Sequence, residues 1–497
     1  MTADETALTC AQRQLWELDA GGAPPRALNL SYALAIDGPL DLAALSAAFG
    51  TLIQAHEPLR TTYSQHDGVV TAEIIDACSV PPAIAPAVRA ADAKTVAAAA
   101  AADRARAFDL GQDLPLRAEL FQLGPDRHVM VLTMHHIASD GWSIYLLRTQ
   151  LSQYYAAYSA GHAVPAIPSA RLRDIARAQR EWLASPAAGE DARWWLDQLR
   201  GAVPRPAGLR PATAGRAVLL ARAVSIPDEL SRELRGLARQ AGLSLYVVLL
   251  TAFAVLLERC LDCARPVIGT LVANRPTAAS SQVMGAHYNT LLLDIDVDGD
   301  PSLAECLLRA ADRVLAALDR QSLPLPALTA RLEREFGWEA ARTPSVMFIM
   351  DRYPMEGLDL AGCRTRGLYL DAGGELYEPV PAAVTADLVF FVREARDRLT
   401  LSMLWRAGAI PDTAADELAA AYLEILAAMA ESPELALTDL CLWQAATTPI
   451  PAHHPTLPAT ADQTGPAPVL RAVADLAPVD ALSPVAGPLP GSPVTVS

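Results

Sequence analysis

The chain has 497 residues, of which 52% are hydrophobic, with a formal net charge of −16 and an isoelectric point near 5.0. Such an acidic surface repels phosphate backbones and anionic lipids, which excludes nucleic acid and membranes as expected partners. The sequence lacks both an apolar run of about 18 residues and the basic and apolar regions of a secretory signal, so we expect a cytoplasmic protein. The length predicts two or three domains.

The first predicted domain, residues 1–180, alternates strand and helix patterns. Its predicted elements are a strand over 28–36 ending at Asp37-Gly38, a helix from Asp41 to before Pro58, a hairpin around Asp67-Gly68, an alanine-rich helix within 85–108, a buried strand over 128–134 and a helix from Gly141 to Tyr158. The period of the apolar pattern changes from strand to helix at Gly141.

The second predicted domain, residues 181–445, follows a proline-rich stretch and a charged helical run and shows the same alternation. Its predicted elements are strands over 217–226, 266–275, 288–297, 345–351 and 388–405 and helices over 228–242, 244–260, 303–320 and 413–431. Strands alternating with helices in both halves predict an α/β fold built twice. Residues 446–497 are rich in Pro and Ala and are predicted to be a disordered tail.

Two of the nine histidines are adjacent at the predicted strand-to-helix junction, in TMHHIASDGWS. Neighbouring side chains on a strand point to opposite faces, so His135 and His136 cannot both face one pocket. One is expected to brace the core or the turn, and the other to face a cleft at the strand end. Asp140 and Gly141 fit a sharp turn into a helix, with the glycine supplying a conformation that other residues resist. Neither HExxH nor paired CxxC motifs accompany the histidines, so no metal site is predicted.

The pattern HHxxxDG followed by Trp-Ser resembles the signature of the condensation domains of nonribosomal peptide synthetases. Six other segments resemble this family's motifs in the expected order: LTCAQRQLWELDAG, AHEPLRTTY, VIGTLVANRP, GAHYNTLLL, QSLPLPALTARL and RTPSVMFIM. The resemblance covers Leu8 to Leu442.

This resemblance implies a V-shaped pair of subdomains, each similar to chloramphenicol acetyltransferase, with a catalytic histidine in a central tunnel. It assigns the catalytic motif to His135, His136, Asp140 and Gly141, with His136 as the acting histidine. The residues that support the active site would be Arg275, pairing with Asp140, together with Asn289 and Arg60. The residues that line the tunnel would be Trp142, Ser143, His287 and Tyr288.

The residue types suit acyl transfer to an amine. The amine that attacks a thioester must lose a proton, and a neutral imidazole can accept it or simply orient the nucleophile. Both roles of His136 remain open at this stage. His287 and Tyr288 depart from the Phe-Val usual in the family, and Arg320 stands where a histidine is usual, so these positions bear on the acceptor.

The function implied is that of a freestanding condensation enzyme of nonribosomal peptide or hybrid natural-product biosynthesis, acting as an acyltransferase. It would hold no cofactor of its own, because donor and acceptor arrive on the phosphopantetheine of partner carrier proteins. A small amine or alcohol acceptor is an alternative, and a monomer is expected.

Two further alternatives follow from the same resemblance. One is an ester-forming or coenzyme A-dependent acyltransferase of the same superfamily. The other is a non-catalytic module that docks carrier proteins, although such modules carry a broken histidine motif. Epimerisation would need additional features that the sequence does not display.

Overall fold

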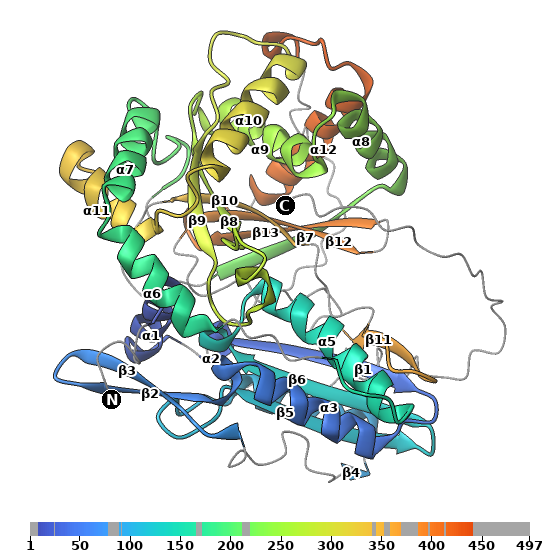
Figure 1. Ribbon diagram of the computed structural model, residues 1–497. Coiled ribbons are helices and arrows are strands. Elements are labelled where there is room, and N and C mark those ends of the chain that lie inside the picture. Colours follow the sequence, from blue (N-terminus) through green and yellow to red (C-terminus); the bar gives the residue numbers. More distant parts are fainter. Residues whose placement is uncertain are drawn as a thin grey trace.

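Two α/β lobes, each built around one large sheet, make up the computed structural model (Figure 1). It describes residues 8–23, 25–77, 89–90, 92–165, 171–210, 219–339, 344–351, 358–368, 386–395, 398–411 and 414–440. The predicted tail, residues 446–497, lies outside these ranges. The predicted α/β fold with two lobes is confirmed, whereas the predicted central tunnel stays a prediction.

The first lobe contains a five-stranded sheet in the order β11-β1-β6-β5-β4 and a separate β2-β3 hairpin. Its elements are α1 (Cys10–Ala20), α2 (Pro25–Leu28), β1 (Asn29–Asp37), α3 (Leu42–Ala55), η1 (Glu57–Arg60), β2 (Thr61–His66), β3 (Val69–Ile74), β4 (Arg89–Ala90), α4 (Ala93–Ala105), β5 (Leu116–Gly124), β6 (Arg127–His135), η3 (His136–Ala138), α5 (Gly141–Ser159) and α6 (Leu172–Leu183).

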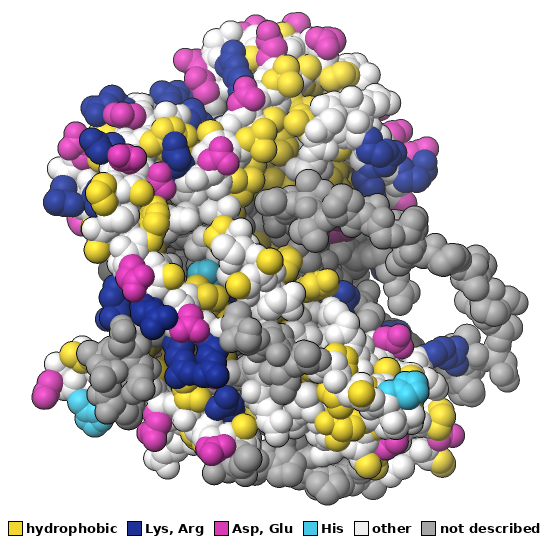
Figure 2. Space-filling view, viewed as in Figure 1, with side chains coloured by type: hydrophobic (Ala, Val, Ile, Leu, Met, Phe, Trp, Pro, Cys, Tyr) yellow, Lys and Arg dark blue, Asp and Glu magenta, His cyan; other side chains and the backbone are white. Residues whose placement is uncertain are grey.

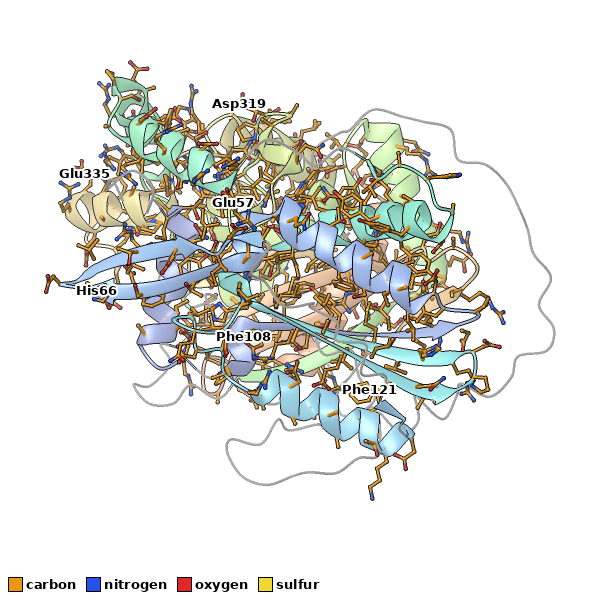
Figure 3. The ribbon with its side chains drawn as sticks, turned by 60° about the horizontal axis from the view of Figure 1, so that its bottom comes forward. Glu57, His66, Phe108, Phe121, Asp319 and Glu335 are labelled. Atoms are coloured by element: carbon orange, nitrogen blue, oxygen red, sulfur yellow. The ribbon has the colours of Figure 1, made fainter. Side chains whose placement is uncertain are left out.

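Alternation along β1 explains how this sheet is covered on both faces. Leu34 and Ile36 face the core shared with α3 and α5, whereas Ala33 and Ala35 face α4. Phe121 of β5, labelled in Figure 3, joins the α4 side. Side chains of successive strand residues point to opposite faces, so one strand serves two cores.

The second lobe has a six-stranded mixed sheet in the order β7-β13-β12-β10-β8-β9. Its elements are α7 (Pro186–Leu199), β7 (Leu219–Ile226), α8 (Asp228–Ala241), α9 (Leu245–Leu261), β8 (Val267–Val272), η4 (Ser280–Gln282), β9 (Asn289–Asp294), α10 (Leu303–Leu318), α11 (Leu325–Phe336), β10 (Val346–Asp351), β12 (Leu388–Ala395), β13 (Arg398–Arg406), α12 (Ala414–Glu431) and η6 (Leu437–Asp439). The single strand predicted over 388–405 is therefore two antiparallel strands, β12 and β13.

Helix α9 forms the centre of the second core, and α8, α10 and α12 contact it on one face of the sheet (Figure 1). Within the described ranges no single helix is long and apolar enough to cross a membrane. Helices α8 and α9 reach the required length and composition together, but they are bent by 107° and α9 lies in the core.

One strand from the second half of the sequence completes the first lobe. Strand β11 (Arg364–Leu368) pairs antiparallel with β1, from Ala33 opposite Leu368 to Asp37 opposite Arg364. Its backbone satisfies the hydrogen-bonding groups of an otherwise free sheet edge. The predicted boundary between residues 180 and 181 also falls inside the continuous helix α6. The lobes are therefore joined by α6, and the first lobe contains a strand from the second half of the sequence. A division of the chain at one residue cannot describe this arrangement.

Charge on the visible face of both lobes is mixed rather than of one sign (Figure 2). Acidic and basic side chains alternate over the surface, and a group of basic side chains lies where the lobes meet near α6. In this region Arg171 and Arg173 share one carboxylate, that of Glu57, at 3.2 and 3.5 Å. The net charge of −16 is thus compatible with local positive surface.

Candidate active site

The histidine pair lies at the point where β6 ends. The strand is buried from His128 onward, and the chain turns through η3 before α5 begins at Gly141. His135 is the N-cap of η3, and its Nδ1 accepts a hydrogen bond from the Ile137 backbone N–H at 3.2 Å. Both imidazoles are buried, with 1% and 4% of their residue surfaces exposed. They differ in the atoms that surround them.

His136 is held in one tautomer by its own turn. Its Nδ1 lies 2.7 Å from the carbonyl oxygen of Ser139. A carbonyl oxygen can only accept, so Nδ1 carries the proton and Nε2 presents a lone pair. Burial lowers the pKa of His136 below 6.5, and this effect outweighs the backbone hydrogen bonds and the Asp140 charge, which raise the pKa. The imidazole is therefore neutral at pH 7 with Nε2 ready to accept a proton.

His135 has the opposite tautomer. Because Nδ1 accepts from Ile137, the proton lies on Nε2, which is 3.9 Å from a carboxylate oxygen of Asp19. Phe108, labelled in Figure 3, packs edge-on against the imidazole with ring centroids 5.8 Å apart. His135 thus caps the turn that carries His136 and lies among core side chains.

Asp140 begins α5 and binds the second lobe. One carboxylate oxygen accepts from the backbone N–H and the hydroxyl of Ser143, and also from Arg275 at 3.0 Å. The other oxygen accepts from Arg275 at 2.8 Å and from the His287 backbone N–H at 3.1 Å. Burial raises the pKa of Asp140, but Arg275 and the hydrogen bonds outweigh it and leave the pKa below its ordinary value. The residue is an anion at neutral pH, so it holds the two lobes together and does not carry a proton.

The segment 283–288 brings the second lobe against the histidine turn. Arg275 donates to the carbonyl oxygen of Gly285 at 3.0 Å, and the Gly285 N–H donates to the Ser143 hydroxyl at 2.9 Å. Gly285 has a φ of +127°, and a Cβ at this position would lie 2.4 Å from a methyl carbon of Leu172. The positive φ favours glycine here, and any larger residue would also displace the side chain of Leu172 from α6.

His287 and Tyr288 follow directly and lie near the histidine turn. The Tyr288 ring is 5.5 Å from the His136 ring, centroid to centroid, at an interplanar angle of 44°. Burial, aided by the Arg275 charge, lowers the pKa of His287 to about 4, so its imidazole is neutral. Its Nδ1 and the Tyr288 hydroxyl oxygen are buried without a hydrogen-bond partner among the described residues.

Helix α1 contributes two residues that were not predicted. The Thr9 hydroxyl donates to the Ala286 carbonyl oxygen at 2.6 Å, and the Gln12 amide donates to the Ile137 carbonyl oxygen at 3.3 Å. Thr9 and Gln12 also form the capping box of α1. This helix end therefore ties the histidine turn to the segment from the second lobe. The opening motif of the sequence contains both residues, but nothing in their spacing identifies what they bind.

Two residues predicted to support the active site, Asn289 and Arg60, bind backbone groups. The Asn289 amide donates to the carbonyl oxygens of Gln321 and Leu323 and accepts from the backbone N–H groups of Thr290 and Leu325, so both of its polar atoms are engaged. Arg60 binds the carbonyl oxygen of Ile75 at the base of the β2-β3 hairpin. Asn289 thus braces β9 against the start of α11, and Arg60 braces a hairpin; neither faces the histidine through these atoms.

The three motif residues after Asp140 have clear structural positions, and the special backbone conformation expected of Gly141 is not present. Gly141 does not have a positive φ, and a Cβ there would meet no atom within 4 Å. The extended backbone of Asp140, the N-cap of α5, makes the turn instead. Ser143 is fully buried between Asp140 and Gly285. Trp142 is half-buried and donates to the Ser281 carbonyl oxygen at 2.8 Å. Ser143 and Trp142 therefore join the lobes.

Within the described part of the chain, no group of three or more His, Cys, Asp or Glu side chains is arranged to hold a metal ion. The arrangement that is present is a neutral imidazole with a free lone pair, fixed at a junction of two lobes by a buried ion pair. It can accept and return a proton during transfer of an acyl group. Two lobes that meet at one such histidine suit the acyltransferase class.

Comparison with known proteins agrees with this class. The family model described as Condensation domain matches residues 2–448, and the chain belongs to this family. It is similar to the isonitrile lipopeptide synthase of Mycobacterium tuberculosis, with 31% identity over 457 residues, 87% of this chain and 18% of that protein. It is also similar to the dimodular nonribosomal peptide synthase of Bacillus subtilis, with 33% identity over 339 residues, 65% of this chain and 14% of that protein. The chain thus spans less than a fifth of these two relatives.

Solved structures show the same fold. The X-domain from teicoplanin biosynthesis aligns with a TM-score of 0.72 and 24% identity over 89% of this chain and 99% of that chain. The first condensation domain of the CDA synthetase aligns with a TM-score of 0.68 and 20% identity over 88% and 99%. Condensation domains are acyltransferases that form peptide bonds in nonribosomal peptide synthesis.

Proposed function

We propose that this chain forms an amide bond by transferring an acyl or aminoacyl group from a carrier-bound thioester to an acceptor amine. The observation that carries the proposal is the hydrogen bond from His136 Nδ1 to the Ser139 carbonyl oxygen, which directs the Nε2 lone pair away from the turn. A base that must accept a proton from an amine needs this tautomer and a neutral imidazole.

The reaction follows from these groups. The amine nitrogen attacks the thioester carbonyl carbon, and the proton that it loses passes to His136 Nε2. The C–S bond then breaks, and the thiolate takes the proton from Nε2, so the imidazole ends neutral as it began. Holding two tethered reactants together supplies a further part of the acceleration.

The proposed partners are the carrier proteins that bring both reactants on phosphopantetheine arms, which are substrate rather than a resident cofactor. Membership of the family supports this role. Docking of an acidic carrier on an acidic protein requires local positive surface, and Arg171 and Arg173 near α6 supply such a surface. Monomeric state and cytoplasmic location stay predictions.

The test offers acyl thioesters in three forms, on the phosphopantetheine of a carrier, on N-acetylcysteamine and on coenzyme A, with amine and alcohol acceptors, and identifies products by mass spectrometry. Wild type should yield an amide, and His136→Ala should lose it. The matched control is His66→Ala, an exposed histidine on the β2-β3 hairpin (Figure 3), which should keep wild-type activity. Ester product would favour the ester-forming alternative, and product from coenzyme A thioesters without carriers the coenzyme A-dependent one. Absence of product despite carrier binding would favour the docking module.

A further inference from the structure

Tyr288 and His136 lie side by side although they come from different halves of the sequence. Their ring centroids are 5.5 Å apart, and the backbone N–H of the preceding residue, His287, is bound to Asp140 at 3.1 Å. Tyr288 is also in contact with the first core, whereas the strand that follows it, β9, belongs to the second sheet. The hydrogen bond from His287 to Asp140, together with the ion pair between Asp140 and Arg275, therefore fixes the position of this ring relative to the histidine turn.

The Tyr288 hydroxyl is buried without a hydrogen-bond partner among the described residues. Other deeply buried tyrosines of this protein have one. The hydroxyl of Tyr63 accepts from Gln12 at 3.0 Å, that of Tyr246 donates to Thr270 at 2.7 Å, and that of Tyr422 donates to the Leu249 carbonyl oxygen at 3.0 Å. A buried hydroxyl without a partner is costly, and the ring that carries this one packs against the His136 ring, which points to a bound substrate as the missing partner.

We propose that the Tyr288 hydroxyl is a catalytic hydrogen-bond donor to the carbonyl oxygen of the bound acyl thioester. The inference rests on the proposed function of His136. Attack by the amine forms a C–N bond and moves the carbonyl π electrons onto oxygen, which then carries a negative charge. Tyr288 donates its O–H to this oxygen while His136 Nε2 takes the amine proton. When the C–S bond breaks, the electron pair returns from oxygen, and Tyr288 keeps its proton throughout.

The surroundings of Tyr288 suit a donor that is not consumed. Burial, together with the Asp140 charge, raises the pKa of the Tyr288 hydroxyl above its ordinary value of 10, so it stays protonated. A fixed donor in a site that excludes water stabilises developing charge more strongly than water does.

The kinetic test compares Tyr288→Phe with wild type in the amide-forming assay, using the N-acetylcysteamine thioester that wild type accepts best. Phenylalanine keeps the ring contact with His136 and removes one oxygen atom. We expect kcat to fall about 100-fold with KM nearly unchanged, because the donor acts on charge that develops in the transition state. The matched control is Tyr422→Phe, which loses a hydroxyl in the second core and should keep wild-type kcat.

The second readout is thermal unfolding of the same variants without substrate. Tyr288→Phe should unfold at the same temperature as wild type or higher, because no partner is left unsatisfied, whereas Tyr422→Phe should unfold at a lower temperature. If Tyr288→Phe is at least as stable as wild type but has a lower kcat, the hydroxyl acts in catalysis and not in folding.

The outcomes separate this inference from the proposed function. If Tyr288→Phe retains wild-type kcat while His136→Ala loses activity, the hydroxyl has no catalytic role and the proposed function stands. If Tyr288→Phe lowers the unfolding temperature as Tyr422→Phe does, the hydroxyl is a structural one and the inference is overturned. If wild type forms no amide from any thioester offered, both fail.

Discussion

Asp140 and Arg275 form a bidentate ion pair that joins the two lobes at the histidine turn, with nitrogen-to-oxygen distances of 2.8 and 3.0 Å. Their side chains are 4% and 3% exposed. Arg275 additionally binds the carbonyl oxygens of Ala273 and Gly285. The aspartate thus holds the start of α5 and the segment carrying Tyr288 in one arrangement.

Replacing Arg275 by alanine should destabilise the protein strongly. Removing one partner of a buried ion pair leaves the other charge uncompensated, which costs about 3 to 5 kcal/mol. Arg177→Ala is the control, because Arg177 and Asp174 form an ion pair in which both side chains are about half exposed, and its loss should change the free energy of unfolding by at most about 1 kcal/mol. Denaturant unfolding measures both. Equal effects of the two substitutions on the free energy of unfolding would show that the buried ion pair contributes no more to stability than a surface ion pair.

The rate of amide formation should fall in acid with a midpoint below pH 6.5. Neutral His136 is the active form, and its pKa is lowered by burial, so activity is present above that pKa and is lost as pH falls through it. Rates should be expressed per free-base amine, so that ionisation of the acceptor does not contribute. An acid limb with a midpoint above 6.5 would mean that the group responsible is not a buried His136.

The free energy of unfolding should also fall on acidification, because His56 and His287 are buried as neutral imidazoles. Burial lowers the pKa of each to about 4 from 6.5, and for His56 the hydrogen bond to Gln150 offsets this in part. The unfolded chain therefore binds protons first, and stability present above pH 6.5 is lost as pH falls toward 4, by about 3 kcal/mol per residue. His56→Gln should reduce the difference in unfolding free energy between pH 7 and pH 4. An unchanged difference would show that His56 does not titrate on unfolding.

Gly285→Ala should impair folding and activity together. A methyl group would lie 2.4 Å from Leu172, and the φ of +127° is unfavourable for alanine, so a loss of about 2 to 4 kcal/mol is expected. Gly236→Ala is the control, because Gly236 lies within α8 and a Cβ there meets nothing within 4 Å; it should stabilise the helix by about 0.5 to 1 kcal/mol. In a double-mutant cycle, Gly285→Ala should cost less in a Leu172→Ala background than in wild type. Equal costs in the two backgrounds would locate the whole penalty in the backbone.

Much of the fold could be predicted because each pattern is local. The strand ending at the histidines and the helix beginning after Asp140 differ in apolar period, and the turn at Asp67-Gly68 is encoded by two adjacent residues. Strand β11 could not be predicted in this way. It has five residues without a clear alternation, and it exists because the edge of β1, more than 300 positions earlier in the chain, needs a partner.

The site was predictable as a set of residues but not as a set of contacts. The motif indicated His136 and Asp140, yet the tautomer depends on where the Ser139 carbonyl oxygen points. Asn289 was expected to support the active site, but that it does so by binding backbone groups at the start of α11 could not be read from the sequence. The contact between Tyr288 and His136 depends on the packing of one lobe against the other, which no spacing within a motif records.

The proposed mechanism depends above all on His136 accepting the proton of the attacking amine. A single-turnover measurement of amide formation, with the acyl group already loaded on the carrier and the amine in excess, tests this step without the influence of product release. We predict that His136→Ala is slower than wild type by at least about 100-fold while unfolding at a similar denaturant concentration. A rate within about threefold of wild type would refute this role and leave the positioning of tethered reactants as the source of the acceleration.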